Sequence, residues 1–331
     1  MIIHLDKNVS REKAEQLAAS YQSILLENEA FILITPSKIK VVDDALKKYA
    51  EEIFITNSDI QLAGRNYIPS KREVLIGDTA IGGNTHNTIV ITGPCSVESE
   101  EQIESAAKLC VELGVKVLRA GAFKPRTSPY TFQGLGLDGL KLLDKMRNKY
   151  GLQIITEVRD STHVDQIIEY ADVIQIGAKS MYDHGILKKC GKSKKPVLLK
   201  RGFGTTLQEF VQAAEFILSG GNPNVILCER GIRTFETKTR FTLDLCGVSW
   251  LKEYTNLPVI LDPSHAIGYA YGVPDLSRAC VAMGIDGLLI ESHPDPTVAK
   301  SDADQQLNFE QFRNLHFSLK KVADAVGYKI V

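Results

Sequence analysis

The chain has 331 residues, 44% of them hydrophobic and 24% charged, which is typical of a soluble globular protein large enough for a barrel-sized domain and a smaller one. Its net charge of -1 at pH 7 excludes the strongly basic surface of a nucleic-acid-binding protein. Six scattered cysteines without a CxxC pair favour a reducing compartment over a secreted disulfide scaffold. Without a signal peptide or an apolar run of membrane-spanning length, the sequence predicts a cytoplasmic protein that contacts no membrane.

Residues 1–60 predict a small domain of their own. Apolar strand-like runs alternate with two helix-like segments, and Ser10 stands where the first helix should begin. The expected elements are a strand MIIHL, a helix after Ser10, strands SILLEN and AFILIT, a helix VVDDALKKYAEE and a strand IFIT. This βαββαβ order is that of the ferredoxin-like fold. No chemistry-bearing cluster accompanies it, so docking or oligomerisation fits these residues as well as ligand sensing does.

Residues 61–87 predict a polar linker and then a short hairpin, EVLIGD and AIGGN, that caps the main domain. Over residues 88–331, eight apolar strand-like runs alternate with helix-like segments: TIVITG, VKVLRAG, LQIITEV, DVIQIGA, PVLLKRG, VILCERG, PVILDPS and DGLLIES. Eight such strands, each followed by a helix, predict a closed (β/α)8 TIM barrel. A doubly wound open sheet is the alternative, but no GxGxxG fingerprint follows an early strand.

The run LRAGAFKPRTSPYTFQG, residues 118–134, carries three cations: Arg119, Lys124 and Arg126. No Asp or Glu occurs between residues 113 and 137 to pair with them. Two prolines stiffen the loop, so its charged groups can be held at fixed positions for a phosphate or carboxylate. A solvated basic loop is the plainer interpretation, but the Gly, Pro and aromatic content indicates a shaped site.

Cations also follow other strands of the predicted barrel, at the ends where barrel active sites lie. The set is Arg119, Lys124, Arg126, Lys179, Lys200 and Arg230. Each alone could form a structural ion pair, but six cations in an empty pocket would repel one another. They therefore predict a substrate with several negative charges, best a phosphorylated carbon compound. The like charges around Lys124 predict a lowered pKa for its ammonium group and a role as proton donor.

A second set of strand-end residues has soft or anionic side chains: Cys95, His265, Glu291 and Asp302. A thiolate, an imidazole and two carboxylates suit Mn, Fe, Co or Zn better than Mg or Ca. Their spacing is no local metal motif, and a single Cys at a strand end is more often just a small buried residue. Closure of the barrel would bring the four together, and a metal there would polarise an aldehyde or orient a water.

Longer motifs are distributed over nearly all of residues 88–331: GPCSVES, LRAGAFKPRTSPYTFQGLG, QIGA, PVLLKRGF, ILCERGIRTFE, LDPSH, and IESHPDP with SDADQQL. Together they resemble the 3-deoxy-D-arabino-heptulosonate 7-phosphate (DAHP) synthases, in the branch shared with the 3-deoxy-octulosonate 8-phosphate (KDO8P) synthases. The KPRT run at 124–127 is similar to the DAHP signature, where KDO8P enzymes have an Ala-Asn-Arg-Ser type sequence. The resemblance implies condensation of phosphoenolpyruvate with erythrose 4-phosphate, the entry step of the shikimate pathway. The alternatives are KDO8P chemistry on arabinose 5-phosphate and a non-catalytic metabolite-sensing barrel.

The resemblance also implies roles for single residues. The metal ligands would be Cys95, His265, Glu291 and Asp302, and the catalytic residues Lys124, Cys95 and His265. The phosphoenolpyruvate site would comprise Arg119, Lys124, Lys200 and Arg230, and the clamp for the erythrose phosphate Arg126 and Thr127. Lys179 stands where the family usually has Arg, and its point charge cannot form a bidentate fork, which predicts weaker phosphoenolpyruvate binding.

Some relatives carry a ferredoxin-like regulatory domain that binds aromatic amino acids. The resemblance of residues 1–60 to that domain implies Phe or Tyr as an effector, and the family resemblance implies a homotetramer. Two further departures have no assigned consequence: Ser292 replaces a usual Val, and the stretch AIGYAYGVPDLS lacks the basic residues of many relatives.

Overall fold

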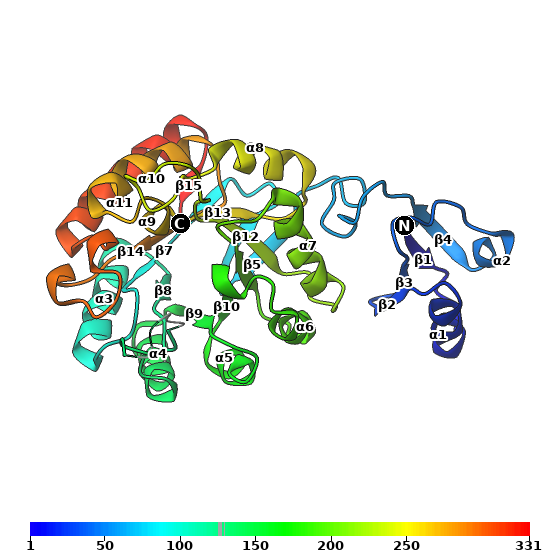
Figure 1. Cartoon of the computed structure of the whole chain (residues 1–331), viewed down its shortest axis with the longest axis horizontal. Helices are drawn as coiled ribbons and strands as arrows, with labels where there is room; N and C mark the ends of the chain where they lie inside the picture. The colour runs from blue at the N-terminus through cyan, green and yellow to red at the C-terminus, as the bar shows by residue number, and fades with distance from the viewer. Residues whose placement is uncertain (125–127, 129) are drawn as a thin grey trace.

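The computed structural model describes residues 1–124, 128 and 130–331 of the chain. Its N-terminal part is a four-stranded antiparallel sheet with two helices (Figure 1). The elements are β1 (Ile2–Leu5), α1 (Arg11–Ser20), β2 (Ile24–Glu27), β3 (Phe31–Ile34), α2 (Asp44–Lys47) and β4 (Ala50–Phe54). Ser10 caps α1 by accepting a hydrogen bond from a backbone N–H group, as expected. The strand order β2-β3-β1-β4 confirms the ferredoxin-like fold.

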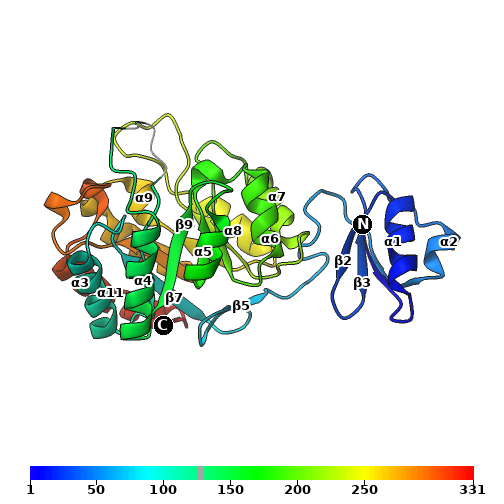
Figure 2. The same cartoon turned by 90° about the horizontal axis from the view of Figure 1, so that it is seen from below.

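Both faces of this sheet are apolar, because one face packs against the domain's own helices and the other against the main domain. Ile3 and Leu33 pack with helix residues such as Leu17. Ile2 and Ile34 belong to a different cluster, which is continuous with the core of the main domain. In Figure 2 the helices α1 and α2 accordingly lie on the side of the sheet that faces away from the barrel. The sheet is therefore a middle layer between its own helices and the main domain.

The second helix of this domain is shorter than predicted. The sequence favoured a helix over residues 41–52, whereas α2 comprises four residues and β4 already begins at Ala50. β4 pairs antiparallel with β1 over its length. Tertiary pairing at the sheet edge therefore overrides the local helix propensity of residues 50–52.

Eight parallel strands form a closed barrel surrounded by helices (Figure 1). The strands are β7 (Asn87–Gly93), β8 (Val117–Arg119), β9 (Gln153–Val158), β10 (Val173–Ile176), β11 (Val197–Lys200), β12 (Val225–Glu229), β13 (Val259–Leu261) and β14 (Gly287–Glu291), and pairing of β14 with β7 closes the ring. The outer helices are α3 (Glu100–Leu113), α4 (Leu137–Tyr150), α5 (Val164–Tyr170), α6 (His184–Lys192), α7 (Leu207–Leu218), α8 (Leu245–Tyr254), α10 (Val273–Ala282) and α11 (Phe309–Ala325). Short helices are α9 (Pro263–Ile267), η1 (Ala178–Ser180), η2 (Ala270–Gly272), η3 (Pro296–Val298) and η4 (Ala303–Gln305). Each predicted apolar run coincides with a barrel strand, so the barrel is confirmed over the open sheet.

One end of the barrel is closed by apolar structure. β5 (Glu73–Ile76) and β6 (Thr79–Gly82) form the predicted hairpin, and β15 (Lys329–Ile330) pairs with β7. Val74 and Ile81 of the hairpin pack with Ile89 and Ile155 from the barrel interior. In Figure 2, β5 lies at the lower edge of the barrel and α9, which follows a strand, lies toward the upper edge. Ligands can therefore enter the barrel from the opposite end, where the C-termini of the strands lie.

The segment that connects the two parts is held by one carboxylate of α7. Glu215 accepts hydrogen bonds from the backbone N–H groups of Gln61, Leu62 and Ala63, at 2.7, 3.1 and 2.8 Å. The side-chain amide of Gln61 in turn donates to the carbonyl of Thr35 in the small domain, at 3.0 Å. Burial raises the pKa of Glu215 to about 7 although the three N–H groups oppose this rise. The predicted linker is thus a fixed connection at residues 61–63.

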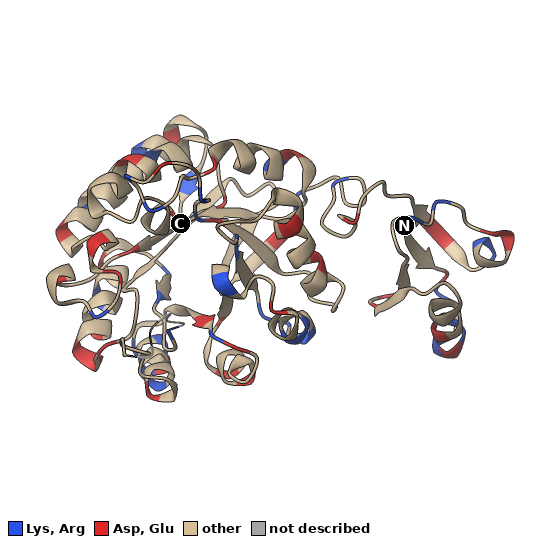
Figure 3. Cartoon of the chain, viewed as in Figure 1, with Lys and Arg blue, Asp and Glu red and all other residues tan. Residues whose placement is uncertain are grey.

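Both blue (Lys and Arg) and red (Asp and Glu) segments occur on the outer helices of the barrel in Figure 3, although α6 carries only Lys among its charged residues. Among the described residues, none of the helices has both the length and the apolar character needed to cross a bilayer. All six cysteines are free thiols, and Cys246 is the exposed one.

Candidate active site

A cavity of about 370 Å³ opens at the C-terminal ends of the barrel strands. Half of its lining consists of residues that the sequence singled out as ligands: Lys124, Lys179, Lys200, Arg230, His265 and Asp302. The other lining residues are Glu157, Ala178, Phe203, Arg233, Arg240 and Phe241. Barrel closure therefore brings together side chains that lie far apart in the sequence, as the strand-end argument predicted.

The cations differ in whether the protein already supplies a partner. Arg119 is buried and bonded through Nη1 to Glu291, and Lys200 is buried with Nζ 2.6 Å from a carboxylate oxygen of Asp262. Arg119 and Lys200 thus each form a structural ion pair, the alternative to ligand binding that the sequence left open. Arg230 is also buried, but its Nε and Nη1 have no hydrogen-bond partner in the described part of the chain. A buried guanidinium with unsatisfied donors is suited to an anionic ligand.

Lys124 extends into the barrel toward the first strand of the ring. Its Nζ lies 3.0 Å from the sulfur of Cys95 and 3.2 Å from the Cys95 carbonyl oxygen. The predicted lowering of its pKa is wrong. Burial lowers the pKa of Lys124, but Cys95 and Glu157 raise it more, so the net shift is upward. The sequence showed the neighbouring cations, whereas the groups that outweigh them come from other strands.

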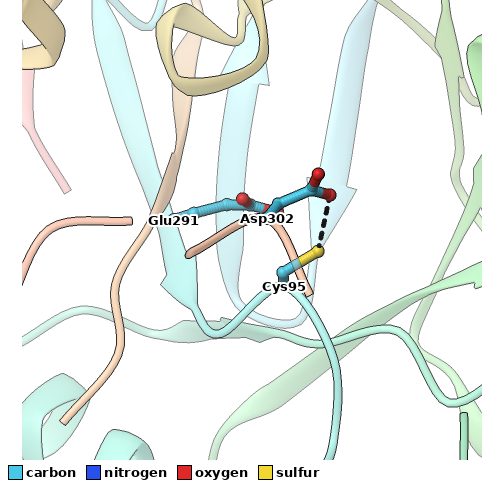
Figure 4. Close-up of side chains that lie close together, drawn as sticks. All are labelled: Cys95, Glu291 and Asp302. Carbon is cyan, nitrogen blue, oxygen red and sulfur yellow. Dashed lines mark hydrogen bonds between the residues drawn. The ribbon is translucent and has the colours of Figure 1, made fainter. Parts of the chain in front are cut away.

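Three of the four predicted metal ligands form a cluster (Figure 4). The donor atoms of Cys95, Glu291 and Asp302 all lie within 4.8 Å of one another, and the Cys95 sulfur is 3.1 Å from a carboxylate oxygen of Asp302. They come from the loop after β7, the end of β14 and the loop before η4. Asp302 has a left-handed backbone, with φ of 48°, which is costly for a residue other than glycine.

His265, the fourth predicted ligand, lies beside this cluster on α9. Its Nε2 is 3.6 Å from the Glu291 carboxylate, and its Nδ1 is 2.8 Å from Asp262. Burial lowers the pKa of His265, which keeps the ring neutral, and Asp262 favours the proton on Nδ1. Nε2 is then left with a lone pair on the side of Glu291.

The donor set fits a divalent metal. Burial and the nearby Glu291 raise the pKa of the Cys95 thiol to about 12, so a thiolate there needs added positive charge. Neutral imidazole, thiol sulfur and two carboxylates are ligands of borderline transition metals. Cys95, Glu291 and Asp302 could hold such an ion directly, with His265 adjacent.

Two predicted site residues, Arg126 and Thr127, lie outside the described residues. Lys179, on η1, is exposed at the cavity edge. Because Lys179 lines the same cavity as Lys124, Lys200 and Arg230, its position agrees with a role in binding the same ligand.

Two aromatic residues, which were not predicted from the sequence, line one side of the cavity. The rings of Phe203 and Phe241 are stacked with centroids 5.5 Å apart. Arg230 lies 4.4 Å from the Phe241 centroid, and Arg233 lies 4.8 Å from that of Phe203. Such contacts orient guanidinium groups without neutralising them. Phe203 lies in the PVLLKRGF motif, but Phe241 follows a strand by more than ten residues and gives no sequence signal.

Fold and cavity together define a class, the barrel enzymes that take anionic substrates at their C-terminal strand ends. The model of the DAHP synthetase I family matches residues 56–327, and the chain belongs to this family.

Comparison with individual proteins agrees with this membership. A phospho-2-dehydro-3-deoxyheptonate aldolase from Thermotoga maritima is 48% identical over 270 residues, which cover 82% of this chain and 79% of the relative. A 2-dehydro-3-deoxyphosphooctonate aldolase from Syntrophotalea carbinolica is 33% identical over 256 residues, 72% of this chain and 91% of the relative. A crystal structure of the aldolase (DAHP synthase) from Thermotoga maritima has a TM-score of 0.81 at 42% identity and covers 100% of this chain and 99% of its own. A truncated form of the Thermotoga maritima synthase has a TM-score of 0.77 at 43% identity, over 83% of this chain and 100% of its own.

Proposed function

We propose that this chain condenses phosphoenolpyruvate with erythrose 4-phosphate and water to give 3-deoxy-D-arabino-heptulosonate 7-phosphate and inorganic phosphate. The observation that carries the proposal is a strand-end cavity with a buried, unsatisfied Arg230 in a chain of the DAHP synthetase I family. Two phosphorylated substrates supply the anionic partners that the unsatisfied donors of Arg230 lack.

The cavity cations are divided between the two substrates. Phosphoenolpyruvate is bound deep in the barrel by Arg119, Lys124, Lys200 and Arg230, with Lys179 at the edge. Arg126 and Thr127 take the phosphate of the aldose. Fixed cations around both phosphates hold the enol carbon against the aldehyde and stabilise the charge that develops. The raised pKa of Lys124 leaves its Nζ protonated at neutral pH, so it can donate a proton to the oxyanion formed from the aldehyde.

Cys95, His265, Glu291 and Asp302 hold a divalent metal, Mn, Fe, Co or Zn, in this proposal. When bound, the metal supplies Lewis-acid polarisation of the aldehyde oxygen. His265 and Cys95 then contribute as ligands, and Asp262 fixes the ring of His265 through Nδ1.

The test is consumption of phosphoenolpyruvate by the purified chain with Mn²⁺, comparing erythrose 4-phosphate with arabinose 5-phosphate before and after chelation. Turnover with erythrose 4-phosphate that is lost on chelation and restored by metal is expected. Turnover with arabinose 5-phosphate alone would instead favour the second candidate, KDO8P synthesis, which the 33% identical octonate aldolase makes the nearest alternative. The absence of turnover with either aldose would favour a sensing barrel.

Feedback by Phe or Tyr through the N-terminal domain is a separate part of the proposal. A cavity of about 680 Å³ lies between its sheet and α6 and α7. Apolar side chains such as Ile34 and Phe216 line it beside the ammonium groups of Lys188 and Lys192. An apolar body with a carboxylate suits this lining. Equal activity with and without saturating Phe and Tyr would refute the regulation.

The proposed assembly is a homotetramer. Sedimentation equilibrium of the full chain should give four times the 36.5 kDa of one copy. A monomer mass at assay concentration would reject it.

A further inference from the structure

Two consecutive glutamines, Gln305 and Gln306, lie between the candidate metal ligands and the start of α11. They belong to the SDADQQL motif, to which the proposed chemistry assigns no task beyond Asp302. Both residues are buried, with 2% and 1% of their surface exposed, although each side chain ends in a polar amide. Buried amides are costly unless each end has a partner, so their contacts indicate what they are held for.

Gln305 joins Glu291 to the cavity wall. Its Nε2 lies 2.6 Å from Oε2 of Glu291, and its Oε1 lies 2.7 Å from Nη1 of Arg240. A guanidinium can only donate, so the amide oxygen must face Arg240 and the amide nitrogen must face the carboxylate. The orientation of Gln305 is therefore fixed by chemistry. With Arg119 on Oε1, each oxygen of Glu291 has its own donor.

Gln306 joins the other two ligands of the cluster. Its Oε1 accepts a hydrogen bond from the backbone N–H of Cys95 at 3.0 Å. Its Nε2 donates to the carbonyl of Ser301 at 2.8 Å, one residue before the left-handed Asp302. A backbone N–H also only donates, so this amide too has a single orientation. The hydrogen bond between Gln306 and Cys95 thus joins residues that are 211 positions apart in the sequence.

The next residue attaches the glutamine pair to the barrel. The N–H of Leu307 donates to the carbonyl of Glu291 at 3.0 Å, and the carbonyl of Leu307 accepts from the N–H of His293 at 2.9 Å. Leu307 therefore forms an isolated parallel β-bridge with Ser292, the residue that follows β14. Leu307 is also fully buried. Both amides extend from a backbone that is fixed to the strand carrying Glu291.

We propose that Gln305 and Gln306 are positioning residues that hold Glu291, Cys95 and the Asp302 turn in the arrangement that binds the metal. This inference rests on the metal-dependent function proposed above. Partners of this kind orient a ligand and typically change metal affinity by 10- to 100-fold when removed. Neither glutamine is a ligand itself, because both amides are engaged with protein atoms.

The test uses the full chain after chelation, with Co²⁺ as the probe. Variants Gln305→Met and Gln306→Met keep the side-chain length and lose the hydrogen bonds. Gln175→Met is the matched control, because Gln175 is buried on β10 and donates to a carboxylate, Glu157, outside the donor cluster. Calorimetry measures Co²⁺ affinity, and the near-ultraviolet thiolate-to-cobalt band reports the Cys95 geometry.

We expect Co²⁺ affinity to fall about 10-fold or more in both Met variants, and the thiolate band to change in Gln306→Met. Gln175→Met should keep the parental affinity and band. Arg240→Ala, at an exposed side chain, removes the group that orients Gln305 and that also lies 3.6 Å from a carboxylate oxygen of Asp302, and it should weaken Co²⁺ binding less than Gln305→Met does. It also supplies a readout if a buried variant fails to fold.

Parental affinity and an unchanged band in the Gln305, Gln306 and Arg240 variants would overturn the inference while leaving the metal centre intact. A fall in affinity equal to that of Gln175→Met would also overturn it, because a general loss of packing would then explain the effect. Failure of the parent itself to bind Co²⁺ would overturn the metal centre and the inference together.

Discussion

Arg230 is a buried cation with unsatisfied donors and no carboxylate partner among the described residues, whereas Arg201, whose Nε is also unsatisfied, has two carboxylate partners, Glu229 and Asp244. The two arginines adjoin neighbouring strands, yet they have different electrostatic costs. An unsatisfied buried charge destabilises the free protein and is compensated when an anion binds.

Replacement of Arg230 by Met should therefore separate stability from binding. We expect a melting temperature of the free protein equal to or above that of the parent, and loss of the stabilisation by phosphoenolpyruvate. Arg201→Met is the control, because it leaves Glu229 unpaired and should cost about 3–5 kcal/mol of unfolding free energy. Thermal scans with and without phosphoenolpyruvate measure both. A normal ligand-induced shift in Arg230→Met would contradict the assignment.

His316 on α11 predicts how stability depends on pH. Burial lowers its pKa to about 4 from a usual 6.5, and neither ring nitrogen has a side-chain hydrogen-bond partner among the described residues. The unfolded chain therefore binds more protons between these pH values, so stability falls as pH drops from 6.5 to 4. From pH 7 to pH 5 this group should remove about 2 kcal/mol of unfolding free energy.

Urea unfolding at pH 7 and pH 5 measures that loss. In His316→Leu the loss between the two pH values should be smaller by about 2 kcal/mol than in the parent. An identical pH dependence in the parent and His316→Leu would show that another group is responsible.

Single residues were predictable where they end or directly follow an apolar strand. Lys200 and Arg230 are such cases, because the strand ends themselves mark the mouth of the barrel. Arg240 lies in a long irregular connection and Gln305 in the short helix η4, and in neither does a periodicity in the sequence indicate which residues turn inward. The pKa direction of Lys124 was wrong for a related reason: the groups that raise it, Cys95 and Glu157, come from the two neighbouring strands and not from its own loop.

At the scale of elements, the close approach of β7 and β8 depends on Gly93. Gly93 ends β7 with φ of 142°, and a Cβ atom there would overlap the carbonyl oxygen of Arg119 at the end of β8. Only glycine combines this backbone with this spacing. Gly93 thus helps to position Arg119 because it has no side chain.

Gly93→Ala should cost about 3 kcal/mol or more of unfolding free energy and weaken phosphoenolpyruvate binding, because Arg119 must move. Gly114 is the matched control: its φ is 73°, but open space surrounds the position of its Cβ. Gly114→Ala should cost about 1 kcal/mol and leave binding unchanged. Urea unfolding and phosphoenolpyruvate titration distinguish them, and equal costs would argue against the close approach.

The elements themselves were largely predictable because buried parallel strands are continuous apolar runs. The exception, the short α2, occurs where residues 50–52 combine helix-forming side chains with a strand position beside β1. Local propensity contains no information about the partner strand, which lies more than forty residues earlier.

At the scale of the whole molecule, Glu215 is the main polar contact of α7 with the connecting segment. In Glu215→Ala three backbone N–H groups lose their acceptor, at a cost of about 2–4 kcal/mol. Hydrogen exchange should become faster at residues 61–63 while barrel strands such as β11 keep their protection. Glu253→Ala, at an exposed position on α8, should change neither. Uniformly faster exchange would indicate global destabilisation rather than release of the connection.

The hairpin that closes the N-terminal end of the barrel has a kinetic consequence. With Val74 and Ile81 packed into the interior, the described residues leave the cavity open at the C-terminal ends of the strands, where ligands enter and leave. A molecule bound near that opening therefore obstructs arrival and departure of whatever lies beneath it. The chain should consequently exchange its ligands in a fixed sequence, in which the deepest ligand enters first and is released last.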